Sequence, residues 1–245
     1  MKNISIQTFE RYEFKFFLTK NLRTKIENDI SKFMTIDQNA KINNKYFVRS
    51  LYFDDDFSTE YYNKTDGMKI RHKFRLRTYS SNKEENIPIF LEIKGRNNQR
   101  TYKKRITILK KNLSFFENKI IPNSLDQELL NNEIISKFFF EKFRRNISPK
   151  IITDYWRSPY VSEYDRYFRL TFDNDITIKK TNRLFENNNS FIRKCLPGFS
   201  ILEIKFNRRI PKWFHRIIQS YNLTRLSISK FCLGMETADI SINLE

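Results

Sequence analysis

Charged and apolar residues alternate along several short segments of this chain. The clearest runs are Arg75-Leu76-Arg77, Glu92-Ile93-Lys94 and Glu203-Ile204-Lys205. A β-strand sends successive side chains to opposite faces, so each run produces one charged face and one largely apolar face. The pattern therefore predicts a sheet with one predominantly cationic face.

The same period of two, together with aromatic and β-branched residues, predicts that strands dominate the chain. Residues 90–94 and 103–109 are expected to form a hairpin around the loop 95–99. The other expected strands are 6–17, 45–53, 68–79, 150–156, 167–172, 175–180 and 200–206, with 226–231 as a closing segment.

Helical spacing predicts three or four helices packed outside the sheet. One is expected at 19–34, and a longer one from Ser124, whose spacing to Gln127 suits a capping box, to about Arg145. Short helices are expected after the Asp54-Asp55-Asp56 run and from Pro211. Strands outnumber helices by about eight to three or four, which favours an antiparallel α+β domain over residues 1–245.

The charge balance limits the kinds of ligand that the chain is expected to bind. The chain has 46 Lys and Arg against 28 Asp and Glu, a formal net charge of +18. Such a field attracts nucleic acid, anionic membranes or phosphate-rich molecules without distinguishing among them. Four glycines leave no phosphate-binding glycine loop, so any phosphate must be held by side chains. Two histidines and two cysteines exclude a metal cluster built from these residues.

Targeting signals are not evident. The N-terminus lacks a secretory apolar region, and no apolar run approaches the roughly 20 residues that span a bilayer. We therefore expect a cytoplasmic protein without a transmembrane segment. Any membrane association would be peripheral or through a partner.

Two interpretations of the charged faces remain open. In the first interpretation, each charged face simply lies in water. However, the cations share these faces without enough alternating anions, and unit charges 4 Å apart repel by about 4 kcal/mol at an effective dielectric constant of 20. Closing about eight strands into a barrel would instead turn the charged rows inward, where a chain of phosphates would relieve the repulsion. We therefore expect a closed antiparallel β-barrel tunnel with helices packed outside.

An ordered series of motifs resembles the VTC domain, the polyphosphate polymerase branch of the CYTH-like triphosphate tunnel metalloenzyme superfamily. The resemblance extends over nearly the whole chain. The motifs are, in chain order, Arg11-Tyr12-Glu13-Phe14-Lys15, Ser50-Leu51-Tyr52-Phe53-Asp54-Asp55, Lys64 with Gly67, Arg75-Leu76-Arg77, Phe90-Leu91-Glu92-Ile93-Lys94, Lys103-x-Arg105, Tyr155-x-Arg157, Arg169-Leu170-Thr171-Phe172-Asp173, Leu202-Glu203-Ile204-Lys205 and Ser229-Lys230-Phe231.

The resemblance implies an enzyme that binds ATP and inorganic polyphosphate and transfers the terminal phosphoryl group to the growing chain, with Mn²⁺ or Mg²⁺. It implies a metal-binding role for Glu203. Catalytic contacts are expected from Arg75, Arg77, Lys94, Arg157 and Arg169. Substrate contacts are expected from Lys15, Lys64, Lys103, Ser229 and Lys230, and alternation along the strands adds Arg71, Arg105 and Lys205.

The chain departs from the family pattern at three positions. Arg11 stands where the wider superfamily has a leading Glu, which favours anion binding over metal ligation there. Lys64 replaces an Arg of some relatives and offers a point charge in place of a bidentate fork. Ser227 replaces a further Lys, so one phosphate contact is expected to be lost.

Other functions remain open at this point. A metal-dependent tripolyphosphatase or nucleoside triphosphatase would use the same site with water as the acceptor. A non-catalytic module could bind polyphosphate or RNA, because basic residues interleaved with Phe and Tyr can stack bases. A narrow closed tunnel would exclude bases, so no specific nucleic-acid partner is expected.

Overall fold

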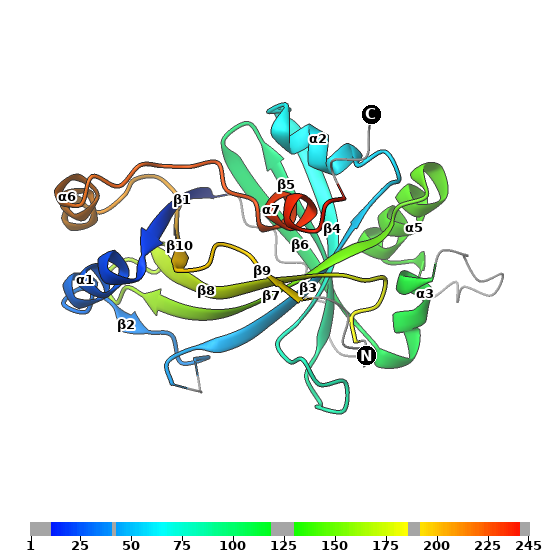
Figure 1. Ribbon diagram of the computed structural model, residues 1–245, viewed down its shortest axis with the longest axis horizontal. Helices are drawn as coiled ribbons and strands as arrows, with labels where there is room; N and C mark the ends of the chain where they lie inside the picture. The colour runs from blue at the N-terminus through cyan, green and yellow to red at the C-terminus, as the bar shows by residue number, and fades with distance from the viewer. Residues whose placement is uncertain (1–10, 41–42, 119–129, 186–191, 241–245) are drawn as a thin grey trace.

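The fold is built on an antiparallel sheet, shown in Figure 1. The computed structural model describes residues 11–40, 43–118, 130–185 and 192–240. Within these residues the strand order is β1-β10-β8-β7-β3-β4-β5-β6, with β2 beside β7 and β9 beside β8. The strands are β1 (Tyr12–Thr19), β2 (Thr35–Ile36), β3 (Tyr46–Asp54), β4 (Ile70–Thr78), β5 (Ile89–Asn97), β6 (Arg100–Ile108), β7 (Ser148–Val161), β8 (Arg169–Lys180), β9 (Ile192–Lys194) and β10 (Phe199–Phe206).

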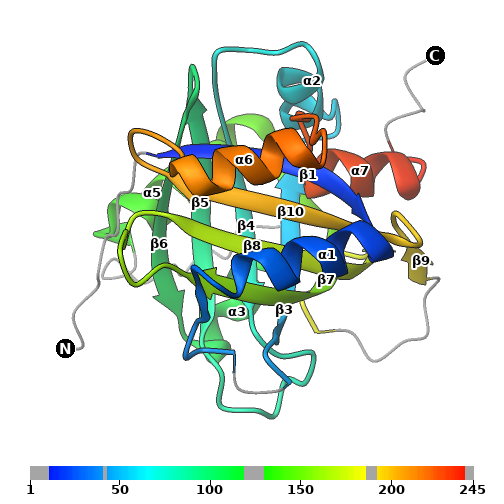
Figure 2. The same cartoon turned by 90° about the vertical axis from the view of Figure 1, so that its left-hand side faces the viewer.

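Helices cover the apolar face of the sheet in two groups. Figure 2 shows α1 and α6 in front of β1, β10 and β8, where the buried Ile26 and Phe214 join Phe172 in one core cluster. At the other end of the molecule, α5 packs Phe138 against strands β3 to β6. The helices are α1 (Lys20–Ile30), α2 (Thr59–Thr65), η1 (Lys110–Asn112), α3 (Leu113–Glu117), α5 (Glu133–Arg145), α6 (Lys212–Ser220) and α7 (Lys230–Thr237).

Helix α7 differs from α1, α5 and α6 because it packs on the charged face. Its Phe231 and Met235 join Tyr52, Tyr155 and Ile178 in a third core cluster. Tyr52 points to this face because Leu51 and Phe53 on either side of it belong to the α5 cluster. The helix therefore covers part of the charged face and brings Lys230 toward its charged side chains.

The prediction of a closed barrel is wrong. The structure is a large open antiparallel sheet of ten strands. In the part of the chain that the structure describes, β1 and β6 are not joined as a strand pair. One isolated bridge lies just before β1, where Arg11 and Thr101 exchange backbone hydrogen bonds of 3.1 and 2.9 Å. Closure depends on the tilt and stagger of every strand, whereas alternation fixes only which side chains share a face.

Most predicted elements are present with shifted ends. The helix at 19–34 is confirmed as α1, where Thr19 accepts a hydrogen bond from the backbone of Leu22. The cap predicted after β3 is also confirmed, since Asp54 accepts hydrogen bonds from the backbone amides of Glu60 and Tyr61 at the start of α2. The predicted strands at 45–53, 68–79 and 200–206 correspond to β3, β4 and β10, and α6 follows Pro211 as expected.

Other boundaries differ from the prediction. The hairpin loop is residues 98–99, because β5 continues through Gly95, whose close approach to the Tyr102 ring leaves no room for a side chain. The segments 167–172 and 175–180 form the single strand β8, in which Asp175 takes a positive φ of 51°. The predicted long helix is interrupted, because residues 131–132 are not helical and α5 begins at Glu133 after the cap Asn132. Residues 6–10 and the Ser124 capping box lie outside the described residues.

Candidate functional site

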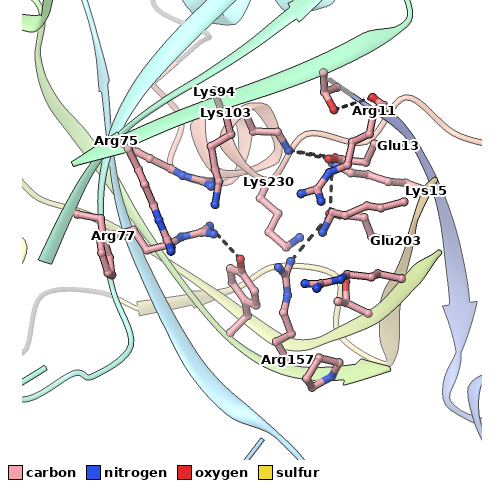
Figure 3. Close-up of a pocket in the computed structure, with 18 of the residues that line it drawn as sticks. Arg11, Glu13, Lys15, Arg75, Arg77, Lys94, Lys103, Arg157, Glu203 and Lys230 are labelled. Carbon is pink, nitrogen blue, oxygen red and sulfur yellow. Dashed lines mark hydrogen bonds and ion pairs between the residues drawn. The ribbon is translucent and has the colours of Figure 1, made fainter. Parts of the chain in front are cut away.

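The charged side chains of the sheet converge on a cavity of about 1520 Å³. In Figure 3 the labelled basic groups point toward a common centre from strands on both sides and from α7. Every predicted site residue lines this cavity: Lys15, Lys64, Arg71, Arg75, Arg77, Lys94, Lys103, Arg105, Arg157, Arg169, Glu203, Lys205, Ser229 and Lys230.

Strand register explains this convergence. Arg75 lies opposite Tyr52 on one side and opposite Glu92 on the other, and Glu92 lies opposite Arg105. Directly opposite residues in an antiparallel pair project from the same face. These four residues therefore form one row across β3, β4, β5 and β6. Two residues further along each strand, a second row across β4, β5 and β6 consists only of basic residues, Lys73, Lys94 and Lys103.

Glu92 is the buried counterion of a first charged cluster, which it forms with Arg75 and Lys103. Its side chain is 0% exposed, and it accepts hydrogen bonds of 2.8 and 2.6 Å from the Arg75 guanidinium, while the Lys103 ammonium lies 3.5 Å away. Burial acts to raise the pKa of Glu92, but Arg75 and Arg77 outweigh it and hold the pKa well below its usual range. Glu92 is therefore an anion at neutral pH.

Arg77 has a different environment from Arg75. Its guanidinium donates hydrogen bonds of 3.1 Å to the hydroxyls of Ser50 and Tyr155, and its nearest Glu92 oxygen is 3.9 Å away. Neutral hydroxyls orient a guanidinium without neutralising it. Arg77 is consequently positioned to bind an additional anion.

Asp173 is the counterion of the second cluster. It is 0% exposed and accepts bidentate hydrogen bonds of 2.6 and 2.7 Å from Arg157, and it also contacts the Lys230 ammonium of α7. Burial raises its pKa, but Arg157 and Lys230 lower it to about 2. The resemblance placed Asp173 in a motif without giving it a role, and the register that sets Asp173 opposite Arg157 is what pairs the two residues.

Glu13 and Glu203 form a third charged cluster, around Lys15. The Lys15 ammonium lies 3.1 Å from one Glu13 oxygen and 3.9 Å from one Glu203 oxygen, and Lys94 donates to Glu13 at 3.0 Å. Lys205 contacts the other Glu203 oxygen. Burial raises the pKa of each carboxyl, and Glu203 raises that of Glu13 further, but the surrounding cationic groups hold both pKa values well below the usual range.

These two carboxylates suit a hard divalent cation. In the described ranges no group of three or more His, Cys, Asp or Glu side chains could hold a metal ion by itself. Mg²⁺ in phosphate-binding sites commonly takes one or two carboxylates and completes its coordination with substrate oxygens and water. The donor set of Glu203 and Glu13 fits that pattern.

The remaining predicted residues lie around the margin of the cavity. Lys64 donates to Ser227 at 2.9 Å, so the serine that replaces a family lysine orients another lysine. Ser229 caps α7 by accepting from the backbone of Cys232, and it also accepts from Lys73 at 3.4 Å. The Arg105 guanidinium lies 4.6 Å from the centre of the Phe90 ring.

Sequence reasoning missed part of the cavity lining. The sequence assigns no role to Lys73 or to the Tyr52 and Tyr155 hydroxyls, which accept hydrogen bonds from Arg75 and Arg77 respectively. Alternation along β3 and β4 signals the inward direction of Tyr52 and Lys73. Nothing in the sequence signals the hydroxyl contacts, because they depend on which strands are neighbours.

Lys103 gives the site a pH dependence. Burial lowers the pKa of Lys103 to about 8 despite the opposing effect of Glu92. We expect the affinity for tripolyphosphate to fall as pH rises from 7 to 9, because this ammonium loses its proton, and Lys103→Arg should flatten that part of the profile. The folding effect has the opposite sign: unfolded Lys103 keeps its proton to about pH 10.5, so this residue favours folding as pH rises above 8.

Calorimetric titration of tripolyphosphate at several pH values measures this effect. Buffers of different ionisation enthalpy would also reveal a proton taken up on binding near pH 8. Equal pH profiles for the wild type and Lys103→Arg would show that Lys103 does not titrate in this range.

Together the fold and the cavity define an antiparallel sheet domain with a largely basic cavity on one face. Basic side chains outnumber carboxylates around the cavity, and three of those carboxylates, Glu13, Glu60 and Glu203, are already paired with cations. The sequence model of the VTC domain matches residues 10–238. The chain belongs to the VTC domain family, which confirms the resemblance and supports the broader prediction of a phosphate-related enzyme.

Solved structures overlap with the chain at low identity. A Bacillus halodurans protein described as a candidate adenylate cyclase has 12% identity and a TM-score of 0.49, covering 91% of this chain and 95% of that chain. The PH1819 protein of Pyrococcus horikoshii has 12% identity and a TM-score of 0.48, covering 92% and 98%. A mimivirus capping-enzyme triphosphatase has 9% identity and a TM-score of 0.36, covering 87% and 88%. These overlaps are long but loose, so the family assignment depends on the sequence model alone.

No curated protein matches the chain. Among the described residues, no helix combines the length and the apolar character that crossing a bilayer requires.

Proposed function

We propose that this protein is a polyphosphate polymerase, which transfers the terminal phosphoryl group of ATP to the end of an inorganic polyphosphate chain. The observation that carries the proposal is the continuity of the basic rows. Lys73, Lys94 and Lys103 form a second row beside the row that contains Arg75, so the cationic lining continues beyond one cluster. A growing polyanion needs such an extended set of counterions.

The reaction requires little from the protein beyond position and charge. A terminal oxygen of the polyphosphate attacks the γ-phosphorus of ATP, the bond to the β-phosphate oxygen breaks, and ADP leaves. That terminal oxygen is largely ionised at neutral pH, since the second pKa of a phosphate is about 6, so no general base is needed. In-line positioning and neutralisation of the equatorial oxygens provide most of the catalysis.

The guanidinium groups suit that role. Arg75 and Arg157 are each fixed by a buried carboxylate, and Arg77 is fixed by two hydroxyls. Their rigid forks match the geometry of phosphate oxygens and can donate two hydrogen bonds at once. Held from both sides of the cavity, the triphosphate would be aligned with the acceptor chain.

Glu203, with Glu13, would hold the divalent cation. When bound, Mn²⁺ or Mg²⁺ supplies positive charge for the phosphate oxygens. Lys15 and Lys94 keep these carboxylates oriented toward the cavity. The expected partners are accordingly ATP, inorganic polyphosphate and one of these cations.

Glu203→Gln should raise the metal concentration that gives half-maximal activity by at least about 10-fold, because the variant loses one anionic ligand. Titrations of activity with Mn²⁺ and with Mg²⁺ measure the shift. Glu133→Gln is a suitable control, since Glu133 is an exposed partner of Lys104 and does not line the cavity. An unchanged metal requirement in Glu203→Gln would remove Glu203 from the metal site.

The product assay tests the proposed function itself. The protein is incubated with ATP and Mn²⁺, and the products are separated on a gel. A ladder of long chains supports the polymerase. Free phosphate without a ladder refutes it and would instead indicate a triphosphatase that uses water as the acceptor.

A further inference from the structure

A second group of cations lies at one end of the charged face. Arg71 near the start of β4 and Arg96 near the end of β5 are directly opposite each other in register. Lys64 of α2 lies beside them, and all three line the cavity. Burial lowers the pKa of Lys64, and the neighbouring Arg71 and Arg96 lower it further, so these charges are close enough to repel.

The polar partners of this group are neutral. Arg71 donates to the backbone oxygen of Met68, and Arg96 donates to that of Asn98 at 2.5 Å. Lys64 donates to the Ser227 hydroxyl at 2.9 Å. Among the described residues, none of these three cations has an ion pair with a carboxylate, unlike Arg75 and Arg157.

Like charges directly opposite each other destabilise a sheet. In the central clusters the repulsion is offset by Glu92, Asp173 and the pair of Glu13 and Glu203. At this end no described carboxylate pairs with Lys64, Arg71 or Arg96, and Glu60, one turn before Lys64 on α2, is already paired with Arg145 at 2.9 Å. The missing counterion is therefore expected to come from a ligand.

The group continues the central site. Along β4 the inward residues run from Arg71 through Lys73 and Arg75 to Arg77, and six residues of strand extend about 20 Å. A triphosphate held by Arg75 and Arg77 is too short to reach Arg71 as well. A longer phosphate chain would reach it, with Lys73 and Lys94 between the two groups.

The opposite end of the cavity has a different chemistry. There Tyr46 and Tyr79 make an edge contact with ring centres 5.6 Å apart, and Arg105 lies over Phe90. Aromatic rings suit a nucleoside better than a bare phosphate chain. At the other end Lys64, Arg71 and Arg96 contribute charge, and the nearby Tyr102 ring is packed against Gly95, which suits a ligand without bases.

We propose that Lys64, Arg71 and Arg96 form a distal subsite that binds the phosphates of inorganic chains longer than a triphosphate. The inference rests on the proposed function, because it assumes that the central cluster holds a phosphate chain. It adds a preference for substrate length. The subsite retains the far end of the chain while the near end reacts.

Binding measurements with two ligands test this subsite without catalysis. Tripolyphosphate and a homogeneous polyphosphate of about 15 units are titrated calorimetrically into the wild type and into Arg96→Gln, without nucleotide or metal. The wild type should bind the longer chain more tightly. Arg96→Gln should lose about 10-fold in affinity for the longer chain, the effect of one charge-assisted contact, and keep its tripolyphosphate affinity within about twofold.

The control is Lys104→Gln, which makes the same change in net charge. Lys104 pairs with Glu133 and does not line the cavity, so both affinities should stay near the wild-type values. Retained tripolyphosphate binding by Arg96→Gln shows that the variant is folded. Arg71→Gln provides a second variant with the same expected selective loss.

Three outcomes would contradict the proposed distal subsite. They are equal affinity of the wild type for both ligands, an equal loss for both ligands in Arg96→Gln, and no loss for either. A wild type that prefers the longer chain but synthesises no polymer would refute the polymerase and leave the subsite standing. A wild type that binds neither ligand would refute both proposals.

Discussion

Arg77→Gln is expected to reduce polyphosphate synthesis by at least about 100-fold, the usual effect of removing one charged group that stabilises a transition state. The fold should remain intact, because Arg77 bonds to the hydroxyls of Ser50 and Tyr155, which accept other donors or water. Glu92 keeps its hydrogen bonds to Arg75. Initial rates of polymer formation and urea unfolding curves measure the two properties separately.

Arg75→Gln should differ from Arg77→Gln in stability. It leaves Glu92, which is 0% exposed, without its principal counterion, and breaking a buried ion pair costs about 3–5 kcal/mol of unfolding free energy. The double variant Arg75→Gln with Glu92→Gln should recover much of that stability and remain inactive. Lys110→Ala is the control, since this exposed lysine bonds to backbone oxygens of Lys83 and Glu85 and should retain activity. Wild-type activity in Arg75→Gln or Arg77→Gln would remove these residues from the site.

The second large effect concerns the anion that holds Arg157 and Lys230. Asp173→Asn should lower the free energy of unfolding by about 3–5 kcal/mol, because two buried cations lose their shared counterion. Since the pKa of Asp173 falls to about 2 from the usual 3.8, its stabilisation is present above pH 4 and is lost as pH falls through 2. Urea unfolding at pH 7 measures the loss.

A bound phosphate chain should offset this loss. Tripolyphosphate is expected to raise the urea midpoint of Asp173→Asn at least as much as that of the wild type, because the ligand supplies the missing negative charge. Asp154→Asn breaks another bidentate pair, with Arg49, that does not line the cavity. Its loss should be smaller, since Asp154 is 19% exposed, and tripolyphosphate should affect it as it affects the wild type. An unchanged stability of Asp173→Asn would contradict the proposed counterion role.

The cationic face could be predicted from the sequence because it depends only on alternation. Arg75 and Arg77, or Glu203 and Lys205, must share a face wherever the strand lies. The family motifs then identified which strands contribute to one site. This is why the predicted residues line one cavity although the predicted barrel is not formed.

Closure and pairing could not be predicted in the same way. Whether β1 meets β6 depends on the tilt accumulated over all the intervening strands. The bond between Asp173 and Arg157 requires the register of β7 against β8, which shifts at a bulge between Asp154 and Trp156. Helix α7 gives a weak local signal because it is eight residues long and contains Gly234.

The open sheet also changes one expectation about partners. A closed narrow tunnel would exclude nucleic-acid bases by its width, whereas an open sheet does not exclude them in this way. Selectivity against nucleic acid must instead come from the spacing of the cations. Competition between polyphosphate and RNA therefore tests whether the cavity selects phosphate chains over nucleic acid.

The central claim is that the cationic face binds a chain of phosphates in place of its missing counterions. The most direct test is a calorimetric titration of tripolyphosphate into the wild type and Arg77→Gln, repeated with single-stranded RNA as a competitor. The account predicts saturable binding by the wild type, weaker binding by Arg77→Gln and little displacement by RNA. Equal binding by both proteins, or complete displacement by RNA at comparable phosphate concentration, would contradict it.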